Sequence, residues 1–73
     1  MFSKIQYVYI LYKEQSFTKA AEKLNVSQPY LSAAIKRIEK QIGAPLFERK
    51  FSSVRPTKVG YEYLQAAEKI MDI

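Results

Sequence analysis

The sequence predicts a mainly α-helical fold with one short β-hairpin between its last two helices. Apolar residues recur at the three- and four-residue spacing of helices through most of the 73-residue chain. A Ser or Thr precedes each periodic segment, which is typical of capped helices joined by tight turns. Between residues 46 and 56, two short strand-like segments flank a tip at residues 50–53 and predict the hairpin.

The first helix is predicted over residues 3–14, with Ser3 as its cap and Phe2 folded back as a hydrophobic staple. Tyr7 and Tyr9 make this helix apolar on more than one side. Such a helix is either tightly buried in a small domain or in contact with a second protomer, and we favour the second interpretation.

The second helix is predicted to begin after Ser16, with Phe17 pointing back into the core. Gln15 is expected to end the first helix in a left-handed conformation, with some strain because it is not glycine. Thr18 and Lys19 lie in the first turn, where free N–H groups and the positive end of the helix dipole suit a phosphate. Thr18 could instead only assist capping.

Asn25, expected in a left-handed conformation, and Val26 form a turn that separates the second helix from a third, which Ser27 caps and Gly43 ends. At about 100° per residue, one narrow stripe of the third helix is apolar and predicts a buried side: Leu31, Ala34, Ile35, Ile38 and Ile42. The other side is small and basic, with three flanking residues: Pro29, Ala33, Lys36, Lys40, then Tyr30, Ser32 and Arg37. A helix that enters a DNA major groove needs such a pair of faces.

The hairpin is predicted from strands at 46–49 and 54–56, and Pro56 marks the end of an edge strand. So short a hairpin is expected to be stable only if it packs against the helices, through Leu46, Phe47 and Val54. Phe51 at the tip either packs onto the core or faces solvent.

The last helix is predicted to start after Thr57, with Gly60 permitting a close backbone approach in its first turn. Its apolar residues cover about half of its circumference, which exceeds what its own small domain requires and predicts a partner helix. No Gly, Pro or polar cap precedes residue 73, so we interpret the chain as a fragment that ends inside a longer helix.

Charge is concentrated in the middle of the chain. The whole sequence has 12 Lys or Arg against 7 Asp or Glu, for a net charge of +5. Residues 18–58 hold nine of these bases and three of the acids, whereas residues 59–73 hold one base and three acids. The middle segment is therefore suited to a polyanion, and the final segment is not.

The composition also excludes several classes of function. The chain has no Cys and no His, which excludes disulfides, thiolate metal sites and the commonest general base. No apolar run approaches the roughly 20 residues that cross a bilayer. We therefore expect a cytoplasmic, nucleoid-associated protein that is not an enzyme and has no cofactor, metal site or membrane partner.

Five segments, in order and without gaps, are SFTKAAEKL, VSQPYLS, IKRIEKQIG, PLFER and VRPTKVG. Through them nearly the whole chain resembles the N-terminal DNA-binding domain of LysR-type transcriptional regulators. The resemblance implies a winged helix-turn-helix at residues 1–57, with a three-helix core and a two-stranded β wing. Residues 58–73 would then start a dimerising linker helix. A small-molecule inducer would act only through a sensor domain, for which no residues are present here.

The implied function is sequence-specific binding of double-stranded DNA by a homodimer, with the third helix in the major groove and the wing near the minor groove. Four residues are the candidates for base readout: Gln28, Pro29, Ser32 and Ala33. Candidates for phosphate or wing contacts are Thr18, Lys19, Tyr30, Lys36, Arg37, Arg49 and Lys50. Candidates for the dimer interface are Tyr7, Tyr9, Tyr63, Ala67 and Ile70.

This chain departs from the family pattern at three places. Gln15 and Ala33 stand where the family usually has a Gly and a basic residue, and residues 51–53 replace Gly and Arg at the wing tip. The change at Ala33 shifts base contacts toward Gln28, Ser32 and Lys36. The alternative reading is a winged-helix module that binds protein and not DNA, which a neutral or acidic outward face of the third helix would favour.

Overall fold

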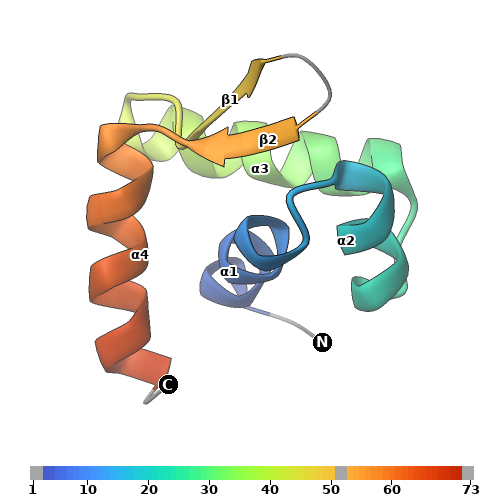
Figure 1. The fold of residues 1–73 in the computed structure, drawn as a ribbon, viewed down its shortest axis with the longest axis horizontal. Helices are drawn as coiled ribbons and strands as arrows, with labels where there is room; N and C mark the ends of the chain where they lie inside the picture. The colour runs from blue at the N-terminus through green and yellow to red at the C-terminus, as the bar shows by residue number, and fades with distance from the viewer. Residues whose placement is uncertain (1–2, 51–52, 72–73) are drawn as a thin grey trace.

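Four helices and one β-hairpin follow one another in the computed structural model, which describes residues 3–50 and 53–71. Their bounds are α1 (Lys4–Glu14), α2 (Phe17–Leu24), α3 (Gln28–Ile42), β1 (Phe47–Lys50), β2 (Ser53–Pro56) and α4 (Lys58–Met71). The hairpin formed by β1 and β2, called the wing below, lies alongside α3 (Figure 1). The predicted winged helix-turn-helix followed by a further helix is confirmed.

Each predicted helix start has its capping hydrogen bond. At α1, Ser3 and Gln6 form a reciprocal capping box. The Oγ atoms of Ser16 and Ser27 accept hydrogen bonds from amides in the first turns of α2 and α3. The predicted hydrophobic staple at Phe2 lies outside the described residues.

Three helices end in the left-handed conformation that the sequence predicts. The φ angles are 56° at Gln15, 59° at Asn25 and 89° at Gly43. Only Gly43 adopts this conformation without a Cβ penalty, so Gln15 and Asn25 each carry local strain.

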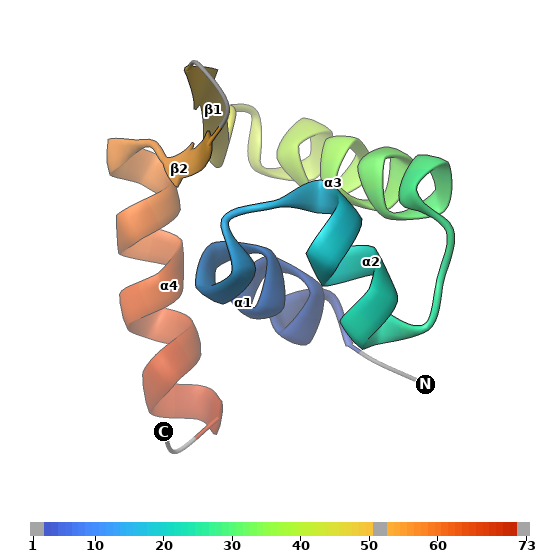
Figure 2. The same cartoon turned by 45° about the vertical axis from the view of Figure 1, so that its right-hand side comes forward.

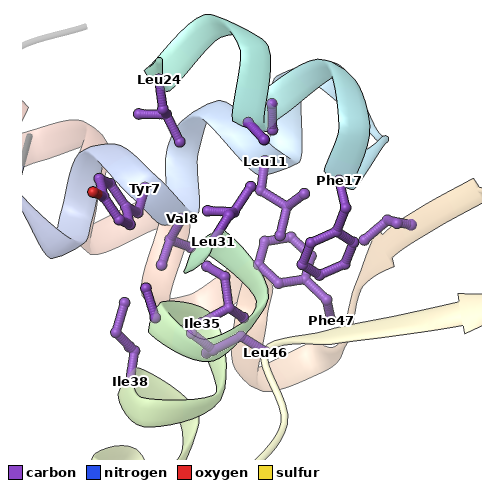
Figure 3. Packing of buried hydrophobic residues seen from close by; sticks show 14 of the residues in the cluster. Tyr7, Val8, Leu11, Phe17, Leu24, Leu31, Ile35, Ile38, Leu46 and Phe47 are labelled. Atoms are coloured by element: carbon purple, nitrogen blue, oxygen red, sulfur yellow. The ribbon is translucent and has the colours of Figure 1, made fainter. Parts of the chain in front are cut away.

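The core lies where α1, α2 and α3 meet and where the wing closes over them (Figure 3). Val8, Leu11, Leu31 and Leu46 have no exposed surface, and they come from α1, α3 and the residue just before β1. The prediction that Ile42 belongs to the buried stripe is wrong, because 42% of its surface is exposed. Ile42 is the last residue of α3, beyond the point where the other elements cover that helix.

The wing is antiparallel, with Phe47 paired to Pro56 and Lys50 paired to Ser53. The predicted contacts with the helices are confirmed, since Leu46, Phe47 and Val54 are all buried. The wing also receives one backbone contact from the helical core, in which the amide of Val54 donates to the carbonyl of Gln15 at 3.3 Å. Phe51, at the predicted tip, lies outside the described residues.

The start of α4 is fixed against the turn that follows α3. Thr57 accepts a hydrogen bond from the amide of Gly60, donates its hydroxyl to the carbonyl of Pro45 at 2.7 Å, and donates its amide to the carbonyl of Leu46. A Cβ at Gly60 would overlap that same Leu46 carbonyl, so the predicted close approach is confirmed. From this junction α4 runs beside α1 and ends on the side of the molecule away from α3 and the wing (Figures 1 and 2).

Candidate nucleic-acid interface

The α2–α3 turn sets the direction in which α3 leaves the core. The left-handed Asn25 lets its own amide and that of Val26 donate to carbonyls in the last turn of α2. Ser27 then caps α3 by accepting from the amide of Tyr30 at 3.1 Å, and Pro29 occupies a position in the first turn that needs no donor. These local bonds place the start of α3 at the protein surface.

The candidates for base readout lie on this exposed start of α3. Gln28, Pro29 and Ala33 are exposed and Ser32 is half-buried, and we call these four residues the reading face. Leu31, on the other side of the same turn, is fully buried. Since this side of α3 does not pack against the protein's own interior, the side chains of the reading face are free to approach another molecule.

Basic side chains surround the reading face on three elements. Every one of them is exposed: Lys36, Arg37 and Lys40 on α3, Lys19 on α2, and Arg49 and Lys50 on β1. Thr18, beside Lys19 in the first turn of α2, is exposed as well. Two of them, Lys36 and Arg49, line the same cleft although they are 13 positions apart in the sequence.

A cleft of about 310 Å³ separates α3 from the wing and the start of α2. Its lining is mixed, with basic, acidic, hydroxyl and aromatic side chains: Phe17, Ser32, Ile35, Lys36, Glu39, Phe47 and Arg49. The guanidinium of Arg49 lies over the ring of Phe17, 4.0 Å from its centroid, which is within the range of a cation–π contact. Arg49 of β1 is thus held against the start of α2, and it lines the same cleft as Lys36.

Glu39 is the residue at this site that the sequence reasoning missed. No role for Glu39 was predicted from the sequence, but its Oε2 accepts hydrogen bonds from the amides of Leu46 at 2.6 Å and Phe47 at 3.3 Å. A carboxylate one turn before the helix-ending Gly43, with a strand a few residues later, is the sequence signal that could have identified it.

An aromatic pair joins α1 to the first turn of α3. The rings of Tyr7 and Tyr30 meet edge to face, with centroids 6.5 Å apart. Burial raises the pKa of the Tyr7 phenol above its ordinary value, and the neighbouring Tyr30 raises it further. Tyr7 therefore stays neutral at physiological pH, while Tyr30 is 54% exposed and its ring extends to the surface.

The candidates for a dimer interface divide into buried and exposed residues. Tyr7 and Ala67 are buried within the chain and have little area to offer a partner. Tyr9 and Tyr63 are half-buried, and Ile70 is 70% exposed. A shallow apolar groove between α1 and α4 continues this surface, lined by Ile5, Tyr63, Ala66, Ala67 and Ile70.

No three His, Cys, Asp or Glu residues among 3–50 and 53–71 lie together in a way that could hold a metal ion. Over the same ranges, none of the helices combines the length and the apolar character that a membrane span requires.

Residues 2–61 match the family described as bacterial regulatory helix-turn-helix protein, lysR family. Over 67 residues, 92% of this chain, it is 42% identical to the HTH-type transcriptional regulator YcgK of Bacillus subtilis (strain 168) and 40% identical to BenM of Acinetobacter baylyi. The alignments cover 21% of YcgK and 22% of BenM, so the chain spans about a fifth of their length. The crystal structure of the BenM_DBD/catB site 1 DNA complex matches with a TM-score of 0.87 at 40% identity, over 93% of this chain and 76% of that chain.

Proposed function

Because the chain belongs to the LysR family of bacterial helix-turn-helix regulators, we propose that it binds double-stranded DNA in a sequence-specific way. The first turns of α3 enter the major groove, and the wing lies near the adjacent minor groove. The observation that carries this proposal is the reading face: Gln28, Pro29 and Ala33 stand at the surface while the opposite side of α3 is buried. The DNA complex of the BenM domain, which has the same fold, supports it.

Base readout is assigned to the reading face by chemistry. The amide of Gln28 can make a bidentate contact with adenine, and the hydroxyl of Ser32 can bond several base edges. Pro29 and Ala33 are apolar and small, so they can touch a thymine methyl group while allowing the helix to come close.

Affinity for the duplex is assigned to the surrounding bases and to two hydroxyl groups. Lys19, Lys36, Arg37, Arg49 and Lys50 neutralise phosphates and release counterions, which gives affinity without sequence choice. Thr18 and the phenol of Tyr30 add neutral hydrogen bonds to phosphates.

We further propose that two copies act together as a homodimer. One domain of this size covers a single half-site, so specificity across a genome requires a second copy at a spacing set by helical turns. The partner would pack against α1 and α4, over the groove that contains Ile5, Tyr63 and Ile70. Because α4 ends on the side away from α3, a dimer made there leaves both reading faces uncovered (Figure 1).

The cellular setting follows from the same proposal. We expect the protein to act in the cytoplasm, on the nucleoid. An inducer would act through a sensor domain outside these residues, which is consistent with relatives about four times as long as the chain.

Selection from a random pool of duplexes tests the DNA-binding proposal. We expect a defined motif to be enriched, and we expect Gln28→Ala to relax the motif at one or two positions. Lys36→Ala should retain the motif but lower the salt dependence of binding by about one ion. Failure to enrich any motif, together with weak binding to all duplexes, would favour a protein-binding module.

Analytical ultracentrifugation tests the dimer. We expect self-association at high micromolar concentration, and we expect Ile70→Asp to abolish it because a charge would be buried at the contact. Gln65→Asp, at an exposed site on α4, is the control. A wild-type chain that sediments as a monomer at this concentration contradicts the dimer made by these residues.

A further inference from the structure

The carboxylate of Glu39 connects α3 to the wing. Its Oε2 lies 2.6 Å from the amide nitrogen of Leu46 and 3.3 Å from that of Phe47, which are the residues where the chain enters β1. Among the described residues, these two hydrogen bonds are the ones that join an α3 side chain to the start of β1 and the residue just before it.

We infer that Glu39 is a positioning residue for DNA binding, which holds the wing at a fixed place beside the reading face. The inference rests on the proposed function. Through this contact, Arg49 and Lys50 on β1 are held where they can reach the same duplex as Gln28. Glu39 touches no DNA itself and acts through the strand it holds.

The location of Glu39 supports this role over that of a solvated surface charge. It is half-buried and lines the cleft between α3 and the wing together with Lys36 and Arg49. A negative charge at this place weakens the attraction of the surface for phosphate, so as a free surface charge it would oppose binding. Its carboxylate instead accepts two hydrogen bonds from backbone amides at the entry to β1.

The two amides that donate to Glu39 belong to buried residues. Leu46 has no exposed surface and Phe47 is 9% exposed, so water cannot easily replace the carboxylate. An unpaired buried amide is costly, and the strand would have to move outward to reach water. Loss of the carboxylate is therefore expected to shift β1 away from α3.

The position of β1 determines the position of Arg49. Arg49 lies two residues beyond Phe47, and its guanidinium is placed over the ring of Phe17, 4.0 Å from the centroid. β1 is thus fixed at its start by Glu39 and in its middle by Phe17. A shift at the start would also take Arg49 and Lys50 out of line with Lys36 on α3.

Three variants separate positioning from charge. Glu39→Ala removes the charge and both hydrogen bonds, whereas Glu39→Gln removes the charge but keeps an oxygen that can accept from both amides. Glu48→Ala is the matched control, since Glu48 is an exposed acid on β1 with no such bond to α3. Binding of each to a mixed-sequence duplex of about 25 base pairs is measured as a function of salt, with and without Lys50→Ala.

Positioning and charge predict different results. If only charge matters, all three variants bind the duplex somewhat more tightly than the wild type. If Glu39 positions the wing, Glu39→Ala alone loses affinity, about 3- to 10-fold, and its salt slope falls by about one. Lys50→Ala should then cost little more in the Glu39→Ala background, whereas it keeps its full effect in the Glu39→Gln background.

Amide hydrogen exchange adds a readout that does not depend on DNA. The amides of Leu46 and Phe47 should exchange slowly in the wild type and in Glu39→Gln, and much faster in Glu39→Ala, while the interior amides of α3 keep their protection. If Glu39→Ala does not fold, Glu39→Asp replaces it, because the shorter side chain cannot reach both amides.

The outcomes distinguish this inference from the proposed function. Equal binding and equal salt slopes for Glu39→Ala and Glu39→Gln overturn the positioning role, as does a full effect of Lys50→Ala in both backgrounds. A wild type that binds no duplex at all overturns the proposed function and the role of Glu39 in it together. Only the first two results leave DNA binding by the domain intact.

Discussion

Helix α3 and the wing lie next to each other and line the same cleft, but they are held in place by different kinds of interaction. The ends of α3 are set by residues adjacent to it in the sequence, Ser27 at its start and Gly43 at its end. The wing has strands of four residues and depends on contacts with other elements, among them Glu39 of α3, Phe17 of α2 and the carbonyl of Gln15. Local sequence therefore defines the helix, and tertiary contacts define where the wing lies beside it.

This difference suggests that α3 and the wing have different roles in binding. An element that must present specific side chains to base edges needs a rigid backbone, which a capped and half-buried helix provides. An element that contributes charge to the phosphate backbone requires less exact geometry. Substitutions in α3 and in the wing should therefore have different effects on stability and on binding.

The largest effect is expected in the buried side of α3. Leu31→Ala should destabilise the fold by about 2–5 kcal/mol, because Leu31 has no exposed surface and its loss leaves a cavity. Ile42→Ala, on the same helix but 42% exposed, should cost less than about 1 kcal/mol. Urea unfolding followed by circular dichroism measures both. Equal losses would mean that α3 is not held by its buried stripe.

The next effect concerns the root of the wing. Gly60→Ala should destabilise the fold by about 1–3 kcal/mol, because the new methyl group overlaps the carbonyl of Leu46. Helix propensity alone predicts the opposite sign, a gain of about 1 kcal/mol. The sign of the change in thermal unfolding thus decides whether α4 packs as closely on this turn as the structure shows.

Substitutions in α3 and in the wing should also differ in their effect on DNA affinity. Gln28→Ala should cost about 1–3 kcal/mol on the selected duplex and almost nothing on a random one. Lys50→Ala should weaken both by a similar factor, because a phosphate contact carries no sequence information. Fluorescence anisotropy measures the affinity of each of the two variants for each of the two duplexes. A Gln28→Ala loss that is equal on both would remove Gln28 from base readout.

The smallest effect is a dependence on alkaline pH at the α1–α3 contact. The pKa of Tyr7 is raised by burial from an unfolded value near 10, so the folded state retains the proton longer. The stability that Tyr7 contributes is therefore complete below about pH 10 and is lost as the pH rises further. Tyr7→Phe, which keeps the edge-to-face packing, should show a smaller decline in melting temperature between pH 9 and 11. An identical decline would contradict a raised pKa.

Most of the fold could be predicted because its signals are local. Ser3, Ser16 and Ser27 cap helices where the sequence predicts caps, and Gln15 and Asn25 adopt the predicted left-handed turns. A cap or a turn depends on a few neighbouring residues, so periodicity and residue type are sufficient to identify it.

The contacts that were missed are all between different elements of the fold or the turns that join them. The bonds of Glu39 to the wing, the stacking of Arg49 on Phe17 and the pairing of Tyr7 with Tyr30 depend on how elements meet in space. For the same reason the tyrosines of α1 could not be divided into buried and exposed. Residue type alone does not say which neighbour covers a side chain.

The left-handed turn at Gln15 offers a way to raise the thermal stability of the domain for use in experiments. A non-glycine residue at φ 56° carries a penalty of roughly 1–2 kcal/mol, whereas glycine adds only about 0.5–1 kcal/mol of chain entropy in the unfolded state. Gln15→Gly should therefore raise the unfolding temperature slightly while leaving untouched the carbonyl that receives the amide of Val54. A domain stabilised in this way would tolerate the long incubations and repeated washes of operator screening.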